Sequence, residues 1–170
     1  MAGGETGNSQ SQQEDEVEVA YSVTIRRPVD EVFGFVGNPN SDPIWGSLIV
    51  ESAPLSPGPV GIGATFQQTA TLMGTRITML IEVTDYEPGR LLRYRASRPF
   101  PIEHCRTVEP TPEGSRLTFV TEIDVQGKFH FAAPFLRQAT RRQMEVDLEA
   151  IKALMEAAPR ESSGVPSRET

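Results

Sequence analysis

The stretch PFLRQATRRQMEVDLEAIKALMEAA, residues 134–158, decides the fold class because it predicts one long helix near the C-terminal end of the chain. It contains no glycine and no proline after its first position, and its inward side chains recur at helical spacing. The stripe consists of Leu136, Thr140, Gln143, Met144, Leu148, Ile151 and Met155. The charged positions predict a mixed solvated face, with Arg137, Arg141 and Arg142 followed by Glu145, Asp147 and Glu149. One buried stripe needs a partner surface, which the preceding chain must supply.

Six segments before this helix are typical of strands. They are separated by turn residues, so they predict an antiparallel meander. The segments are 47–52, 64–73, 75–87, 90–97, 99–109 and 116–125. VEVAYSVTI, residues 17–25, alternates between apolar and other side chains and predicts one more strand ahead of them.

Two short helices are expected between the first strand and the meander. In RRPVDEVFGFVGN, residues 26–38, Pro28 suits the first turn of a helix and apolar side chains follow at helical spacing. Pro39 disfavours continuation of that helix, and a second helical turn can begin at Asp42 and end near Trp45. The order of elements predicts an α+β fold whose sheet wraps the last helix.

The composition of the chain limits the classes of function that the protein can have. A chain of 170 residues with 38 % hydrophobic residues suits one domain, expected over 17–158, with disordered tails at 1–16 and 159–170. The net charge of −7 offers no basic surface for nucleic acid. No stretch approaches a membrane span or a signal peptide, so a cytoplasmic protein without integral membrane association is expected. The single cysteine, Cys105, excludes an internal disulfide, and neither metal nor cofactor is expected.

These elements and their residues resemble the START-like (SRPBCC) superfamily, particularly its polyketide cyclase/dehydrase and lipid-transport branch. The resemblance is carried, in this order, by TIRRPVDEVFGFV, DPIW, GPVGIGATF, VTDYEPGRLLRYR, EPTPEGSRLTF and LEAIKALME, within residues 17–157. It implies a helix-grip fold, in which a curved antiparallel sheet of about seven strands closes around the long C-terminal helix. An apolar cavity is implied between the sheet and that helix.

Three functions are compatible with this resemblance. The first is binding of a hydrophobic or amphiphilic small molecule, such as a lipid, a polyketide or an isoprenoid-like compound, which requires only the cavity. The second is a polyketide cyclase/dehydrase-type enzyme, which also requires a positioned acid or base; no motif in the chain specifies a reaction. The third is a protein-interaction module without a ligand, which would need an exposed apolar patch. The outward strand positions are almost all polar, and no particular protein partner is indicated.

Strand register selects the candidate site residues. The ligand-binding candidates are Tyr21, Trp45, Phe66, Met79, Tyr94, His104, Arg106, Phe119, Thr140 and Gln143. In an enzyme, His104 would act as general acid or base and Arg106 would stabilise an enolate oxygen. Tyr21 or Tyr94 would donate a hydrogen bond to a carbonyl.

Two of these placements have alternatives. Trp45 either borders the cavity or plugs the sheet as a packing residue. His104 and Arg106 share an inner face only if Val108 points into the core, and a bulge at 99–101 would turn both to solvent. Inside the sheet, the guanidinium would need an acidic partner or an anionic or carbonyl-bearing ligand.

Overall fold

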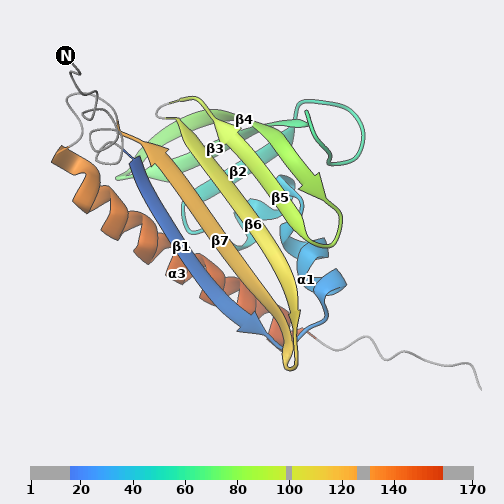
Figure 1. The fold of residues 1–170 in the computed structure, drawn as a ribbon. Helices are drawn as coiled ribbons and strands as arrows, with labels where there is room; N and C mark the ends of the chain where they lie inside the picture. Colours follow the sequence, from blue (N-terminus) through green and yellow to red (C-terminus); the bar gives the residue numbers. More distant parts are fainter. Residues whose placement is uncertain (1–15, 99–100, 126–130, 159–170) are drawn as a thin grey trace, which may run out of the picture.

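The computed structural model describes residues 16–98, 101–125 and 131–158, which form one antiparallel sheet with helices on its concave side (Figure 1). The predicted tails lie outside the described residues, except for Glu16. The strands are β1 (Glu16–Ile25), β2 (Ile49–Pro54), β3 (Thr65–Leu72), β4 (Thr75–Glu87), β5 (Leu91–Ala96), β6 (Ile102–Thr111) and β7 (Gly114–Asp124). The helices are α1 (Val29–Val36), the 3-10 helix η1 (Pro39–Ser41), α2 (Asp42–Trp45) and α3 (Ala133–Ala157).

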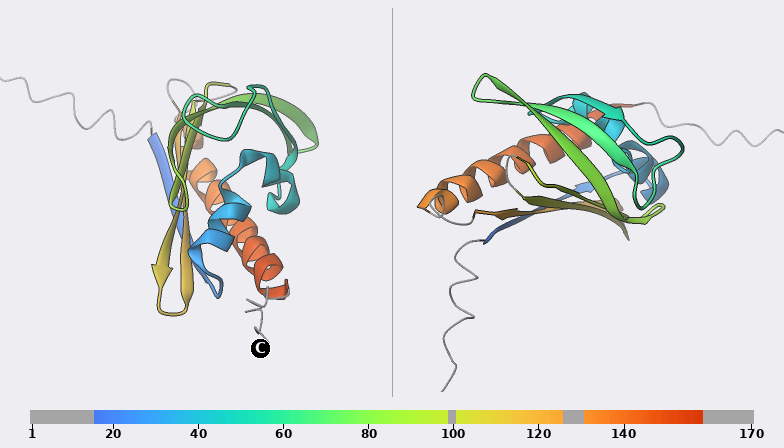
Figure 2. Two further views of the ribbon diagram at one scale, coloured as in Figure 1. Left: turned by 90° about the vertical axis from the view of Figure 1, so that its right-hand side faces the viewer. Right: turned by 90° about the horizontal axis from the view of Figure 1, so that it is seen from above.

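The seven strands follow the order β1-β7-β6-β5-β4-β3-β2. Strands β2 to β7 are an antiparallel meander, and β1 joins the far edge by pairing with β7. Because β1 and β2 occupy opposite edges, the segment from α1 to α2 must cross from one edge to the other. It does so on the concave side, beside α3 (Figure 2). The predicted helix-grip fold is confirmed.

The core lies between the sheet and α3. Met144, Leu148 and Ile151 of α3 are buried, and they face a sheet whose inward positions are mostly apolar. Helix α3 is amphipathic, so its stability depends on the sheet that it covers.

No helix in the described part of the chain is both long enough and apolar enough to cross a membrane.

The C-terminal end of α3 is tied to the end of β1. Nε of Arg27 donates to the carbonyl oxygen of Met155 at 2.9 Å, and its Nη2 donates to the carbonyl oxygen of Ala158. The backbone N–H of Arg26 donates to Oε1 of Glu156 at 2.9 Å. The two bonds from Arg27 satisfy carbonyl groups that a helix end leaves unpaired, and all three bonds anchor this end of α3 against the sheet.

The register of β6 decides which of its side chains enter the core. Its pairing with β5 and β7 runs without a shift from Ile102, so His104, Arg106 and Val108 share the buried face. The alternative register, with both polar side chains in solvent, is wrong. Pro101 lies ahead of the paired strand and leaves its register unaffected.

Candidate functional site

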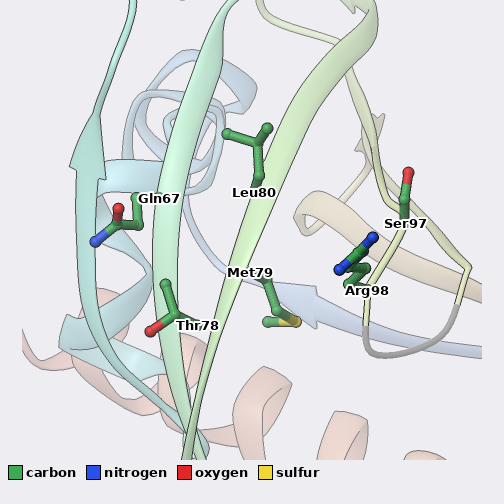
Figure 3. A pocket seen from close by; sticks show the side chains of 6 residues that line it. All are labelled: Gln67, Thr78, Met79, Leu80, Ser97 and Arg98. Atoms are coloured by element: carbon green, nitrogen blue, oxygen red, sulfur yellow. The ribbon is translucent and has the colours of Figure 1, made fainter.

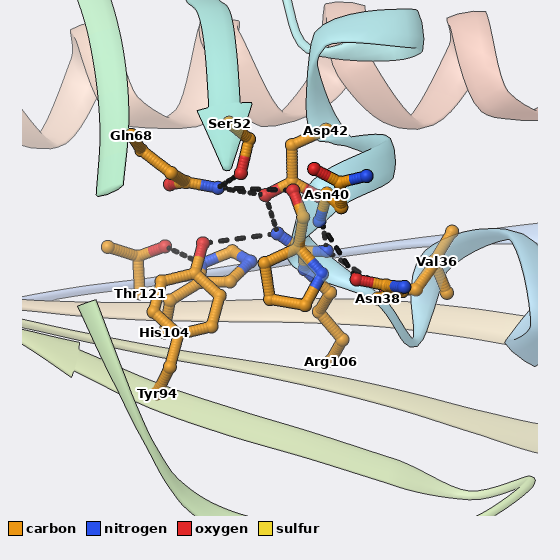
Figure 4. A network of polar contacts seen from close by, with 11 residues as sticks. Val36, Asn38, Asn40, Asp42, Ser52, Gln68, Tyr94, His104, Arg106 and Thr121 are labelled. Carbon is orange, nitrogen blue, oxygen red and sulfur yellow. Dashed lines mark hydrogen bonds and ion pairs between the residues drawn. The ribbon is translucent and has the colours of Figure 1, made fainter. Parts of the chain in front are cut away.

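A buried ion pair joins β6 to α2 on the concave face of the sheet (Figure 4). Arg106 and Asp42 are each only 1 % exposed, and two hydrogen bonds of 2.8 and 2.7 Å link the guanidinium to the two carboxylate oxygens. Nη1 of Arg106 also donates to the carbonyl oxygen of Val36 at 2.9 Å, and Nη2 donates to the hydroxyl of Tyr94 at 3.1 Å. Asp42 is therefore the acidic partner that a buried Arg106 requires.

The proline break after α1 brings Asp42 to this position. Pro39 begins η1, and the side chain of Asn38 caps it by accepting a backbone hydrogen bond at 3.0 Å. Helix α2 begins at Asp42 and ends at Trp45, so the acid and the indole come from opposite ends of one helical turn. This short segment supplies both the counter-charge for Arg106 and an aromatic wall beside it.

Gln68, on β3, extends the network across the sheet. Its Nε2 donates to Oδ2 of Asp42 at 2.8 Å and lies 3.3 Å from the hydroxyl oxygen of Ser52. Gln68 is buried and is absent from the predicted site residues. The signal for it is a polar residue two positions after Phe66, on the inward face of an alternating strand.

The ion pair also sets the ionisation of the groups around it. Burial alone would lower the pKa of Arg106, but the charge of Asp42 and the bonds to Asp42 and Tyr94 outweigh it and hold that pKa above its ordinary value. Burial raises the pKa of Tyr94 to about 12, against the opposing charge of Arg106. At neutral pH the site holds a fixed cation, its counter-ion and a protonated phenol.

His104 lies two residues before Arg106 on the same face of β6. Its Nδ1 is 2.7 Å from the hydroxyl oxygen of Thr121 on β7, whereas its buried Nε2 has no hydrogen-bond partner. Burial, helped by the positive charge of Arg106, lowers the pKa of the imidazole well below its usual value. His104 is consequently neutral at neutral pH, with one ring nitrogen available to a further partner.

Trp45 is the chain's only tryptophan and packs beside these side chains. The centre of its ring lies 4.9 Å from Cζ of Arg106 and 5.6 Å from the ring of Phe119, which meets His104 edge-on at 5.0 Å. The indole Nε1 is buried without a hydrogen-bond partner. Trp45 is therefore a packing residue of the core that also borders the polar network, and its place beside a ligand cavity stays a prediction.

The neutral imidazole makes stability depend on pH. The pKa of His104 is lower in the folded chain than in the unfolded chain. Below about pH 6.5 the unfolded chain therefore binds a proton that the folded chain does not bind. Its contribution to stability is complete above that pH and is lost as the pH falls, at up to about 1.4 kcal/mol per pH unit. In urea titrations between about pH 7 and 5.5, His104→Phe should flatten this loss. An unchanged slope would contradict a neutral buried His104.

The burial of Asp147, on α3, contradicts one prediction. The sequence places it on the solvated face of the helix, but it is buried, and the backbone N–H of Ser47 donates to its Oδ1 at 2.7 Å. Burial raises the pKa of its carboxyl, while bonds from Ser47 and Gln143 act in the opposite direction. The missed signal is spacing, because position 147 lies three residues after Met144 and four before Ile151.

The structure brings five of the predicted site residues into one cluster, namely Trp45, Tyr94, His104, Arg106 and Phe119. Phe66 is buried in the core, while Tyr21, Met79, Thr140 and Gln143 are half-buried. Both terminal nitrogens of the Arg106 guanidinium are bonded to protein groups, whereas its buried Nε has no hydrogen-bond partner. The role of Arg106 toward a ligand stays a prediction.

A pocket of about 380 Å³ opens where β4 extends beyond the end of β5 (Figure 3). Its lining residues are Gln67, Thr78, Met79, Leu80, Ser97 and Arg98, of which only Met79 belongs to the predicted set. It is separate from the cluster around Arg106. Over residues 16–98, 101–125 and 131–158, no three His, Cys, Asp or Glu side chains are grouped as metal ligands would be.

The family model described as "Polyketide cyclase / dehydrase and lipid transport" matches residues 16–156. No curated protein matches the chain in sequence. Solved structures share its fold at low sequence identity. The Zhui aromatase/cyclase from Streptomyces sp. R1128 is 15 % identical with a TM-score of 0.72, over 88 % of this chain and 99 % of that one.

Two further structures are similar. A START superfamily protein from Mycobacterium smegmatis is 14 % identical with a TM-score of 0.70, over 82 % of this chain and 97 % of that one. The di-domain ARO/CYC StfQ from the steffimycin biosynthetic pathway is 15 % identical with a TM-score of 0.73, over 86 % of this chain. The chain spans about half the length of that protein, 53 %, and likewise 52 % of the di-domain ARO/CYC BexL.

Proposed function

Because the chain belongs to the polyketide cyclase/dehydrase and lipid transport family, we propose that it binds a hydrophobic small molecule carrying carbonyl or hydroxyl oxygens between its sheet and α3. The observation that carries this proposal is the pair of unpartnered buried atoms, Nε1 of Trp45 and Nε2 of His104, on residues that both contact Phe119. A buried polar atom without a partner costs about 1–3 kcal/mol. A ligand that bonds to both atoms recovers that cost.

The character of the surrounding side chains narrows the ligand class. Trp45, Tyr94 and Phe119 present aromatic rings, and their neighbours in the core are largely apolar. Arg106 is already neutralised by Asp42, so the site does not call for an anionic ligand. A flat ring system with a carbonyl and a hydroxyl oxygen suits this combination.

A matched pair of ligands tests the proposal. 6-Hydroxy-2-acetonaphthone carries a hydroxyl and a carbonyl at opposite ends of the naphthalene ring, where they cannot bond to each other, whereas 2-ethylnaphthalene has a similar shape without oxygens. By isothermal titration calorimetry we expect the oxygenated compound to bind at least about tenfold more tightly, as expected for one or two hydrogen bonds to otherwise unpaired groups. His104→Phe keeps an aromatic ring without its nitrogens and should reduce that preference.

The control is Glu103→Gln, which alters an exposed neighbour on the opposite face of β6 and should leave the preference unchanged. Equal affinities for the two compounds in the natural chain would contradict the proposal. So would an absence of saturable binding for both of them.

Cyclase/dehydrase chemistry is the second candidate, and one pair of groups favours it. His104 is a neutral imidazole whose Nε2 could take a proton from a carbon beside a ligand carbonyl. The indole N–H of Trp45 would stabilise the enolate oxygen. The protonated imidazole could then pass that proton to a departing hydroxyl, which leaves as water while a carbon–carbon double bond forms. Loss of water from a bound β-hydroxyketone, followed by mass spectrometry, distinguishes this enzyme from a carrier.

A cytoplasmic location of the protein is likewise a proposal, and only the sequence supports it. The interaction module without a ligand is the least supported of the three functions. It offers no reason for the unpartnered buried atoms of Trp45 on α2 and His104 on β6.

A further inference from the structure

We propose that a ligand enters the interior site between α3 and residues 42–50, and that Ser47 and Asp147 hold this entrance closed. The backbone N–H of Ser47 donates to Oδ1 of Asp147 at 2.7 Å, although the two residues are 100 positions apart in the chain. We call this contact the latch. The entrance leads to the site of the proposed function, on which the inference therefore rests.

Helix α3 is attached to the sheet mainly along β1 (Figure 1). Arg137 donates to the carbonyl oxygen of Glu18 at 2.9 Å, and Lys152 donates to the carbonyl oxygen of Thr24. The bonds at the C-terminal end of α3 add a third attachment. Within α2, β2 and the described loop that joins them, Ser47 is the one residue that hydrogen-bonds to α3. We therefore expect the helix to separate from its surroundings most easily at the latch.

Helix α2 is held differently at its two ends. Its first residue, Asp42, forms two hydrogen bonds with Arg106 (Figure 4). Its last residue, Trp45, has an indole Nε1 without a hydrogen-bond partner, and the latch at Ser47 follows two positions later. Opening the latch would let the end of α2 move while Asp42 stays in place. This movement would displace Trp45 and give access to the cluster behind it.

The latch can open at moderate cost because its acceptor is a buried acid. Asp147 is only 5 % exposed, and burial raises the pKa of its carboxyl. A pKa raised by burial means that the charged carboxylate is less stable in the folded chain than in water. Opening the entrance returns this carboxylate to water, which offsets part of the loss of its bond to Ser47.

Exposed apolar side chains flank the latch. Ile44 of α2 is 63 % exposed, Val50 of β2 is 44 % exposed and Val146 of α3 is 51 % exposed. Each of them lies within three positions of Ser47 or Asp147 along the chain. A hydrophobic ligand can contact such side chains on its way from water to the core, whereas an ion gains nothing from them. The surroundings of the latch therefore suit the ligand class of the proposed function.

A reversible cross-link tests the entrance. The variant Ser47→Cys/Asp147→Cys is made in a Cys105→Ser chain, so that oxidation joins the two sides by a disulfide and reduction frees them. The 2.7 Å contact brings the two residues close enough for this bond. Stopped-flow fluorescence of Trp45 follows the uptake of 6-hydroxy-2-acetonaphthone. We expect the oxidised form to bind at least about tenfold more slowly than the reduced form, because the entrance cannot open.

A second disulfide provides the matched control. The hydroxyl oxygens of Ser22 on β1 and Thr118 on β7 lie 2.8 Å apart, on residues that are directly paired in the sheet. Ser22→Cys/Thr118→Cys, in the same Cys105→Ser chain, should bind at equal rates when oxidised and reduced. Asp147→Leu removes the latch without a disulfide and should accelerate uptake and release together by about tenfold, as expected for one lost hydrogen bond to a charged group.

The possible outcomes distinguish the entrance from the site. Saturable binding at equal rates in the oxidised and reduced forms of Ser47→Cys/Asp147→Cys would overturn the entrance and leave the proposed function standing. Equal slowing by the control disulfide between positions 22 and 118 would also overturn the entrance. If no form binds the compound saturably, the proposed function fails and the entrance with it.

Discussion

Replacing Asp42 by alanine is expected to lower the free energy of unfolding by about 3–5 kcal/mol, because it leaves the buried guanidinium of Arg106 without its counter-charge. The remaining partners, the carbonyl of Val36 and the hydroxyl of Tyr94, carry no charge to compensate it. A domain of this size has a total stability of roughly 5–15 kcal/mol. Urea denaturation should therefore show a large fall in the midpoint.

A double variant separates an unpaired charge from poor packing. Asp42→Leu/Arg106→Met removes both charges and fills similar space, so it should regain most of the stability lost in the single variant. If the double variant is as unstable as Asp42→Ala, the unpaired guanidinium is not the cause. The fluorescence of Trp45 gives a second readout, since loosening of α2 in the single variant should expose the indole and shift its emission to longer wavelength.

Phe119→Ala should cost about 3–5 kcal/mol in the free energy of unfolding. Phe119 is buried on β7 and contacts Trp45, His104 and Arg106, so its removal opens a cavity in the middle of the site. The matched control is Phe135→Ala on α3, which should change stability by no more than about 0.5 kcal/mol because its ring is largely exposed. Equal losses in the two variants would contradict the account of the core.

The local pattern of the sequence is sufficient for most of the fold. Apolar alternation bounded by turn residues predicts a strand over 75–87, and β4 occupies these residues; helical spacing likewise predicts α3 within a residue at either end. Both signals reside in side chains that are neighbours along the chain. If the strand segment formed a helix, or the helical segment a strand, an entire apolar face would be exposed to water. Each pattern is therefore compatible with only one stable secondary structure.

The polar network depends on contacts that no local pattern contains. Arg106 meets Asp42 across 64 residues of chain, and the register that turns Arg106 inward is set by pairing with β5 and β7. Asp147 and Gln68 are buried in spite of their polarity because Ser47 and Asp42 supply their hydrogen bonds. Sequence alone indicates that a buried Arg106 needs an acid; it does not say which one.

The most direct test of a ligand between sheet and helix is a native mass spectrum of the purified full chain, followed by denaturation and analysis of what is released. We expect a species heavier than the polypeptide, which releases an apolar compound with carbonyl or hydroxyl oxygens, and a smaller bound fraction in His104→Phe. A spectrum of the polypeptide alone, combined with no uptake of 6-hydroxy-2-acetonaphthone, would contradict binding of such a ligand. The side chains around Phe119 would then form only a packed core.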